Sequence, residues 1–107
     1  MFSLPVVPAV EELKQALRGH YGARLAGLVL FGSRARGDGE TGSDFDLLVK
    51  LHGAVDSEAE IRATGPLVAA LSLRHDAVLS CVFAPEAVFQ HEASPLMINI
   101  RREGIAV

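Results

Sequence analysis

The sequence predicts a small α/β (α+β) domain in which helices pack on a mixed β-sheet. Three observations support this prediction. Two short, mostly apolar runs, 25–31 and 47–51, predict buried strands at 25–31 and 45–51, and the first is bounded by glycine. Apolar residues recur at helical spacing after Pro8 and again after Pro95. A long helical connection separates the second strand from a third at 76–83, which permits parallel pairing in the same sheet.

The length and composition indicate one domain, residues 1–107, and half of these residues are apolar. The net charge of −3 argues against direct nucleic-acid binding, because nucleic-acid binders usually carry a basic surface. A single cysteine, Cys81, excludes an internal disulfide and favours a cytoplasmic location. The N-terminal sequence does not read as a signal peptide, and no apolar run approaches the roughly 20 residues of a membrane span. The sequence is compatible with a homo-oligomer and does not specify the oligomeric state.

The first half of the chain is expected to form a helix and two strands. Pro8 fits the first turn of a helix that ends at Gly19 or Gly22. Residues 25–31 are expected to be buried on both faces of the sheet. In the strand at 45–51 side chains alternate between the two faces. One face holds Phe45, Leu47 and Val49, and the other holds Asp44, Asp46, Leu48 and Lys50.

The second half is expected to be mostly helical. Gly65-Pro66 should divide the connection after the second strand into two short helices, one ending near Ala63 and one running to Arg74. The third strand, 76–83, follows, and Pro85 opens another short helix. The last helix should start at Ser94-Pro95, with Ser94 as its N-cap, and end at Gly104. Its buried stripe should be Leu96, Met97 and Ile100, and the apolar end from Ile105 to Val107 should dock on the fold.

The residues that could bind a ligand or take part in catalysis are concentrated at 32–46, from the end of the first strand to the start of the second. Gly32 allows backbone N–H groups to turn outward, and if Ser33 starts a short helix, its hydroxyl and the free N–H groups form an anion site. Arg34 and Arg36 add cationic donors nearby. These residues therefore suggest a phosphate-binding loop, with an ordinary glycine-rich surface loop as the alternative.

Two aspartates complete this stretch. Asp44 and Asp46 share one strand face with their Cα atoms about 6.7 Å apart, so their carboxylates can converge on a hard cation. Mg²⁺ favours one or two protein carboxylates and takes further ligands from substrate phosphates. A phosphate loop that faces a carboxylate pair is the arrangement required for metal-assisted phosphoryl or nucleotidyl transfer. The alternative, a solvated strand end, is disfavoured because aspartate is depleted in strands.

Residues 32–46 resemble the signature of the DNA polymerase beta-like nucleotidyltransferase superfamily, and most closely that of the minimal nucleotidyltransferase (MNT) group. That signature is Gly-Ser, ten residues, then Asp-x-Asp, and here Gly32-Ser33 precedes Asp44-Phe45-Asp46 by that spacing. Ala-Arg-Gly at 35–37, Ser43 and Arg-Glu-Gly at 102–104 also resemble the group. A match at this many positions is much more specific than a lone glycine-rich loop.

The resemblance implies a polymerase beta-like nucleotidyltransferase fold and a set of site residues. Asp44 and Asp46 would ligate Mg²⁺ and act in catalysis. The third carboxylate of the family is expected on the third strand, where either Asp76 supplies it or the position, close to Ser80, has lost it. The nucleotide, a triphosphate such as ATP, would be bound by Gly32, Ser33, Arg34, Arg36 and Ser43.

The resemblance also implies a reaction and a partner. The chain would transfer a nucleoside monophosphate, AMP from ATP, to a hydroxyl on a partner protein. That partner would be a small helical HEPN-type protein, and this chain would be the antitoxin of a toxin–antitoxin pair. The alternative is an inactive nucleotidyltransferase fold that neutralises a helical partner by contact. Transfer to a small molecule, as larger relatives perform, is disfavoured because the chain is short for such a pocket.

Overall fold

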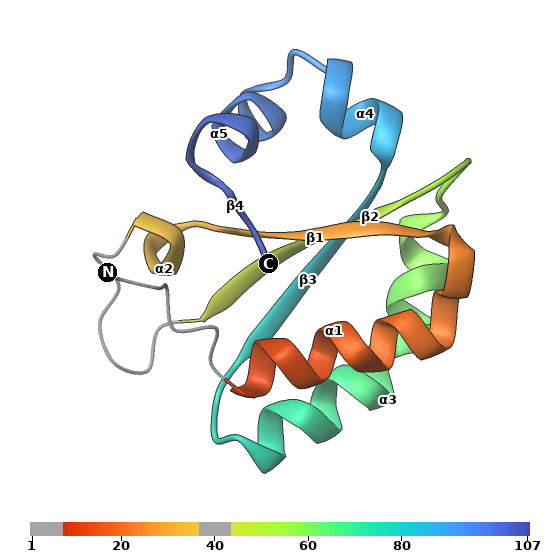
Figure 1. The fold of residues 1–107 in the computed structure, drawn as a ribbon, viewed down its shortest axis with the longest axis vertical. Helices are drawn as coiled ribbons and strands as arrows, with labels where there is room; N and C mark the ends of the chain where they lie inside the picture. Colours follow the sequence, from red (N-terminus) through yellow and green to blue (C-terminus); the bar gives the residue numbers. More distant parts are fainter. Residues whose placement is uncertain (1–7, 37–43) are drawn as a thin grey trace.

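The structure, a computed structural model, describes residues 8–36 and 44–107. Within these ranges a four-stranded mixed sheet lies between two pairs of helices (Figure 1). The predicted fold class is therefore confirmed. The strands are β1 (Leu25–Phe31), β2 (Phe45–Leu51), β3 (Leu79–Pro85) and β4 (Ile105–Ala106), in the spatial order β3-β2-β1-β4. The helices are α1 (Pro8–Tyr21), η1 (Gly22–Arg24), α2 (Ser33–Arg36), α3 (Ser57–Arg74), α4 (Glu86–His91) and α5 (Pro95–Glu103).

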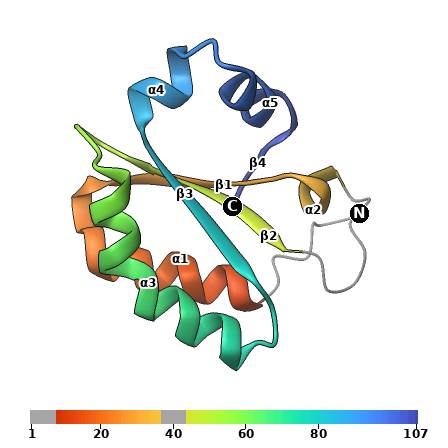
Figure 2. The same ribbon diagram turned by 180° about the vertical axis from the view of Figure 1, so that it is seen from behind.

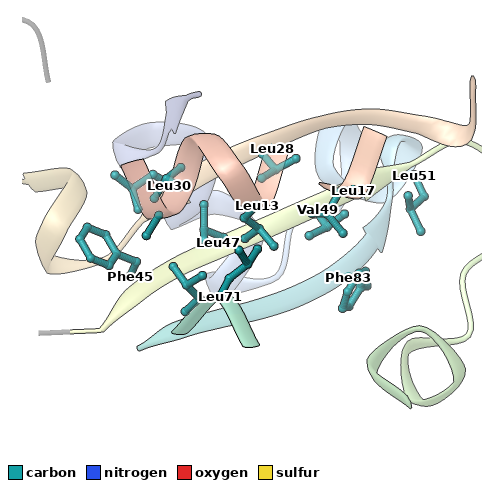
Figure 3. Close-up of a cluster of buried hydrophobic side chains, with 13 residues drawn as sticks. Leu13, Leu17, Leu28, Leu30, Phe45, Leu47, Val49, Leu51, Leu71 and Phe83 are labelled. Atoms are coloured by element: carbon teal, nitrogen blue, oxygen red, sulfur yellow. The ribbon is translucent and has the colours of Figure 1, made fainter. Parts of the chain in front are cut away.

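The sheet separates two apolar cores. Helices α1 and α3 cover one face and α4 and α5 cover the other, as both ribbon views show (Figures 1 and 2). Figure 3 shows the larger core, where Leu13 and Leu17 of α1 lie over Leu47 and Val49 of β2. The smaller core, under α5, contains Val29, Leu48, Ala84, Met97 and Ile100. Because apolar side chains fill both faces of β1 and β2, these central strands are fixed against both helix layers.

Strand pairing brings distant residues beside β2. The strands β1 and β2 are antiparallel and pair Phe31 with Asp46, while β2 and β3 are parallel and pair Asp46 with Ser80. The C-terminal strand β4 adds to the free edge of β1, pairing Ile105 with Leu30. The expectation that the C-terminus docks on the fold is thus confirmed, and Asp46 lies on the central strand with a neighbour on each side.

Several local predictions are confirmed by the geometry. The bounds of β1 and β2 are those predicted, and the alternation of β2 is seen in the two cores, with Leu47 in the larger and Leu48 in the smaller. Ser94 caps α5 by accepting a hydrogen bond of 3.3 Å from the Met97 N–H. Leu96, however, is 46% exposed, so its expected place in the buried stripe of α5 is wrong.

The predicted break at Gly65-Pro66 is also wrong, because α3 continues through it. A proline inside a helix removes one hydrogen bond and costs about 3 kcal/mol. Packing of the helix on the sheet offsets this cost: Leu71 is buried in the larger core, and the buried Thr64 hydroxyl donates to the Glu60 carbonyl at 2.8 Å. Tertiary burial therefore overrides the local signal.

The third strand begins at Leu79, later than predicted, and Asp76 lies in the turn before it. The turn closes the end of α3: the Asp76 N–H donates to the Leu73 carbonyl at 3.3 Å and the Ala77 N–H to the Ser72 carbonyl at 3.0 Å. Asp76 has φ of 50°, a left-handed conformation that aspartate tolerates better than most residues. The helix-ending turn thus uses the residues that the alternation assigned to the strand.

Candidate functional site

The site is built where β1 ends and β2 begins. Because Phe31 and Asp46 are cross-strand partners, the residue after Phe31 lies beside the Asp46 side chain. That residue, Gly32, has φ of 79°, and a Cβ on it would lie 2.6 Å from Asp46 Oδ2. Position 32 therefore needs glycine for two reasons, backbone conformation and space. The Asp46 carboxylate lies directly against the backbone of the turn.

The turn continues into α2, a single helical turn that starts at Ser33 as predicted. The N–H groups of Ala35 and Arg36 donate to the Gly32 carbonyl at 3.1 and 3.2 Å. Gly32 and Ser33 are thereby fixed at the end of a buried strand, next to Asp46. The predicted nucleotide-binding residue Ser43 lies outside the described residues.

The two aspartates are placed at the start of β2. Asp44 is exposed and Asp46 is partly buried. Burial, together with the negative charge of Asp44, raises the pKa of Asp46 above its ordinary value. The two carboxylates therefore repel one another, and a bound cation would relieve that repulsion.

The donor set is suited to Mg²⁺. In the ranges 8–36 and 44–107 there is no group of three or more His, Cys, Asp or Glu side chains that could hold a metal ion. A cation here would take two carboxylate ligands from the protein and the rest from water or a phosphate, which is how Mg²⁺ is commonly bound.

The two arginines of α2 point to different partners. The Arg34 guanidinium stacks 4.2 Å from the ring centre of Phe45, on the sheet face opposite the Asp46 side chain. Arg36 Nη1 lies 3.1 Å from Oε1 of Glu103, the last residue of α5. Glu103 was not among the residues predicted for the site. The signal for it was Arg-Glu-Gly at 102–104, which matched the family signature without an assigned role.

The position beside Asp46 on β3 is occupied by Ser80, which is exposed. Side chains of parallel register partners lie on the same sheet face, so the Ser80 hydroxyl lies on the same face as the Asp46 carboxylate. No residue of β3 is acidic. Asp76, the alternative candidate, precedes the strand by three residues and lies in the turn described above.

Other polar side chains have structural partners. Lys50 Nζ lies 3.3 Å from Glu86 Oε1 and 4.5 Å from the centre of the Phe89 ring, so it holds α4 on the sheet. The Tyr21 hydroxyl donates to Glu60 Oε1 at 2.7 Å and joins α1 to α3. Cys81 lies in an open groove of about 300 Å³ between α3 and β3, where burial raises its pKa to about 11. At that pKa the thiol is protonated at neutral pH and is a poor nucleophile.

The sequence profile of the family described as "Nucleotidyltransferase domain" matches residues 10–93. The chain belongs to this family. The matched region contains Gly32, Ser33, Asp44 and Asp46, so the resemblance seen in the sequence is confirmed at the level of the family. In the described part of the nucleotidyltransferase domain, no helix is long and apolar enough to cross a membrane.

A curated relative and several solved structures resemble this nucleotidyltransferase domain over most of its length. The "Putative protein adenylyltransferase MJ0604" of Methanocaldococcus jannaschii is 35% identical over 97 residues, which are 90% of this chain and 91% of that protein. A toxin–antitoxin crystal structure with AMP-PNP matches with a TM-score of 0.62 and 20% identity, covering 94% of this chain and 72% of that one.

A toxin–antitoxin complex named MntA-HpeT, in a tyrosine-to-alanine variant, matches with a TM-score of 0.59 and 22% identity over 91% of this chain and 70% of that one. A second variant of the complex, in which two aspartates are replaced by glutamate, has a TM-score of 0.61 and 18% identity, with coverages of 94% and 72%. At these identities the structures establish a common fold.

Proposed function

We propose that this nucleotidyltransferase domain transfers AMP from ATP to a hydroxyl on a partner protein in a Mg²⁺-dependent reaction. The observation that carries the proposal is the placement of Gly32 directly against the Asp46 carboxylate, with Ser33 next to it at the start of α2 and the Asp44 charge close to Asp46. The names of the relatives support the nucleotide and the acceptor class, since one is a protein adenylyltransferase and one complex contains AMP-PNP.

In the proposed reaction the acceptor oxygen forms a bond to the α-phosphorus of ATP. The bond from that phosphorus to the bridging oxygen of the β-phosphate breaks, pyrophosphate leaves, and the hydroxyl proton passes to water. A bound Mg²⁺ would neutralise charge on the phosphates. The residues of this chain would hold the reactants in position. Asp44 and Asp46 would hold the metal, and Arg34 stacks on Phe45 at the edge of the loop. The phosphates would be held by Gly32, Ser33, Arg36 and Ser43.

We infer that the acceptor belongs to a helical partner, a HEPN-type protein, and that the domain acts as an antitoxin in the cytoplasm. The toxin–antitoxin context of the structural neighbours supports the pairing, and the single cysteine fits a reducing compartment. The chain is proposed to be one minimal domain that needs its partner to present the acceptor.

The direct experiment is incubation with ATP labelled on the α-phosphate, Mg²⁺ and the protein encoded by the neighbouring gene. Label transferred to that protein, and lost on chelation with EDTA, is the expected result. An absence of label on any acceptor, together with intact ATP binding, would refute the transferase proposal.

A second function is favoured by one observation, the hydroxyl of Ser80 beside Asp46 in place of a carboxylate. Without a third carboxylate the domain would be a binding module that neutralises its partner by contact. The double variant Asp44→Ala with Asp46→Ala separates the two functions. Neutralisation that survives in this folded variant would favour binding alone, and neutralisation that is lost while the complex still forms would favour chemistry.

A further inference from the structure

An ion pair joins the proposed nucleotide loop to the C-terminal end of the last helix. Arg36 Nη1 of α2 lies 3.1 Å from Glu103 Oε1 of α5, and the two residues are far apart in the sequence. The Arg36 side chain is 46% exposed and the Glu103 side chain is 29% exposed. The second carboxylate oxygen of Glu103 lies 3.6 Å from Arg102 Nη2, so both oxygens have cationic neighbours.

The backbone that follows Glu103 fixes the end of α5 close to β1. A Cβ on Gly104 would clash with the Ile100 carbonyl and with Val29 Cγ1, so only glycine allows α5 to end so close to β1. Ile105 then pairs with Leu30 on β1. Since β1 leads directly into Gly32 and α2, the strand that anchors the C-terminus also fixes the distance between Glu103 and Arg36 (Figure 1).

Stability alone is a weak reason for this arrangement, because half-exposed ion pairs contribute little to stability. Orientation is a stronger one. An arginine side chain loses much conformational entropy when it is immobilised, and a partner that already restrains it reduces that loss on ligand binding. A guanidinium has five N–H donors in a fixed fork, so a bond to Glu103 is compatible with a further bond to a phosphate.

We propose that Glu103 is a positioning residue that holds Arg36 toward the phosphates of the bound nucleotide. The proposal rests on the proposed function, because it requires a nucleotide triphosphate beside α2. It gives the Arg-Glu-Gly segment at 102–104 a role: the glycine permits the close approach to β1, and the glutamate orients the loop arginine.

The test is the affinity for the ATP analogue AMP-PNP with Mg²⁺, measured by calorimetry, together with KM and kcat for labelled transfer. Glu103→Gln should weaken binding and raise KM about 3- to 10-fold, with kcat within about twofold of wild type, which corresponds to the loss of one restrained side chain. Arg36→Gln should weaken binding at least as much. In the Arg36→Gln background, Glu103→Gln should have no additional effect, because Glu103 acts through Arg36.

The matched control is Glu58→Gln, which removes the exposed Glu58–Arg62 pair of α3 and should leave affinity unchanged. The exchanged pair, Arg36→Glu with Glu103→Arg, should recover thermal stability but not affinity. If the ion pair were purely structural, affinity would recover together with stability. Unchanged or tighter binding by Glu103→Gln, or additive effects of the two variants, would overturn the inference. If wild type itself binds no nucleotide, the proposed function fails together with it; if wild type binds and Glu103→Gln equals it, the inference alone fails.

Discussion

Gly32 lies so close to Asp46 that a methyl group on it would meet the carboxylate oxygen at 2.6 Å. Glycine at 32 also has φ of 79°, so Gly32→Ala meets both backbone strain and a clash. We expect this variant to lose about 2–4 kcal/mol of unfolding free energy and to bind Mg²⁺ and nucleotide weakly, as measured by urea unfolding and calorimetry. Gly53→Ala is the control, because Gly53 has φ of 84° with open space around it and should lose only about 1 kcal/mol. Equal losses would show that the contact with Asp46 has no effect.

The raised pKa of Asp46 makes stability depend on pH and on metal. Since burial and then Asp44 raise this pKa above its ordinary value of 3.8, the ionised form destabilises the folded state. This penalty is absent below the unfolded pKa and develops as the pH rises through the folded pKa. In EDTA, Asp46→Asn should therefore melt higher than wild type at pH 7, by about a few degrees, and the difference should disappear toward pH 3.

Mg²⁺ should reverse this order at pH 7 by raising the melting temperature of wild type and not that of Asp46→Asn. Glu58→Gln, which keeps both aspartates, should melt like wild type in EDTA and should be stabilised by Mg²⁺ as wild type is. A wild-type melting temperature that does not respond to Mg²⁺ would contradict the assignment of the pair as a metal site.

Asp76 can be tested through its backbone. With φ of 50° it adopts a conformation that glycine accepts without strain, so Asp76→Gly should be neutral or stabilising by up to about 1 kcal/mol. Because Asp76 lies in the turn before β3, we expect labelled transfer to continue in this variant. A stable variant that has lost transfer would instead identify Asp76 as the third carboxylate.

Ser80→Asp places a carboxylate beside Asp46 on the neighbouring strand. Without metal, the added charge should destabilise the fold, because like charges on adjacent strand positions repel. With Mg²⁺, metal affinity and the transfer rate should both rise, the rate by about tenfold or more. Val82→Asp is the matched control, since Val82 is on the same strand face and pairs with Leu48. A gain shared by both variants would reflect charge alone and not the position of Ser80.

Glu60 is a buried acid on α3 that joins this helix to α1 and to η1. It accepts from Tyr21 at 2.7 Å and from Arg24 at 2.9 Å, and the hydrogen bond from Tyr21 lowers its pKa. Glu60→Ala should cost about 2 kcal/mol or more, because two partners lose their acceptor, whereas the exposed Glu58→Ala should cost about 0.5 kcal/mol or less. As a lowered pKa stabilises only the ionised form, the Glu60 contribution should be present above its ordinary pKa of 4.5 and decline as the pH falls below it in urea unfolding at several pH values. Similar losses for the two alanine variants would contradict this role.

The sequence predicted what local chemistry determines. A nearly continuous apolar run defined β1, alternation of side chains defined β2, and Ser94-Pro95 defined the start of α5, because each signal acts within a few residues. Where long-range packing competes with a local signal, the sequence misled. Pro66 remains inside α3 because burial of residues such as Leu71 outweighs one lost hydrogen bond.

At the site, the neighbours of Asp46 could be anticipated only in part. Gly32 and the aspartates are close in sequence, and their spacing identified them. Glu103 comes from the other end of the chain, and its contact with Arg36 depends on the pairing of β4 with β1. No pattern in a single sequence specifies that pairing.

The central place of β2 also affects the order in which the fold assembles. Phe31 meets Asp46 across a short connection, Ser80 meets it only after α3 has been traversed, and Ile105 reaches Leu30 from the far end of the chain. Closing a longer loop costs more chain entropy, and N-terminal segments leave the ribosome first. The strand pair that carries Gly32 and Asp46 is therefore best placed to form early in synthesis, and the ion pair between Arg36 and Glu103 is completed last, when the C-terminal strand closes the sheet.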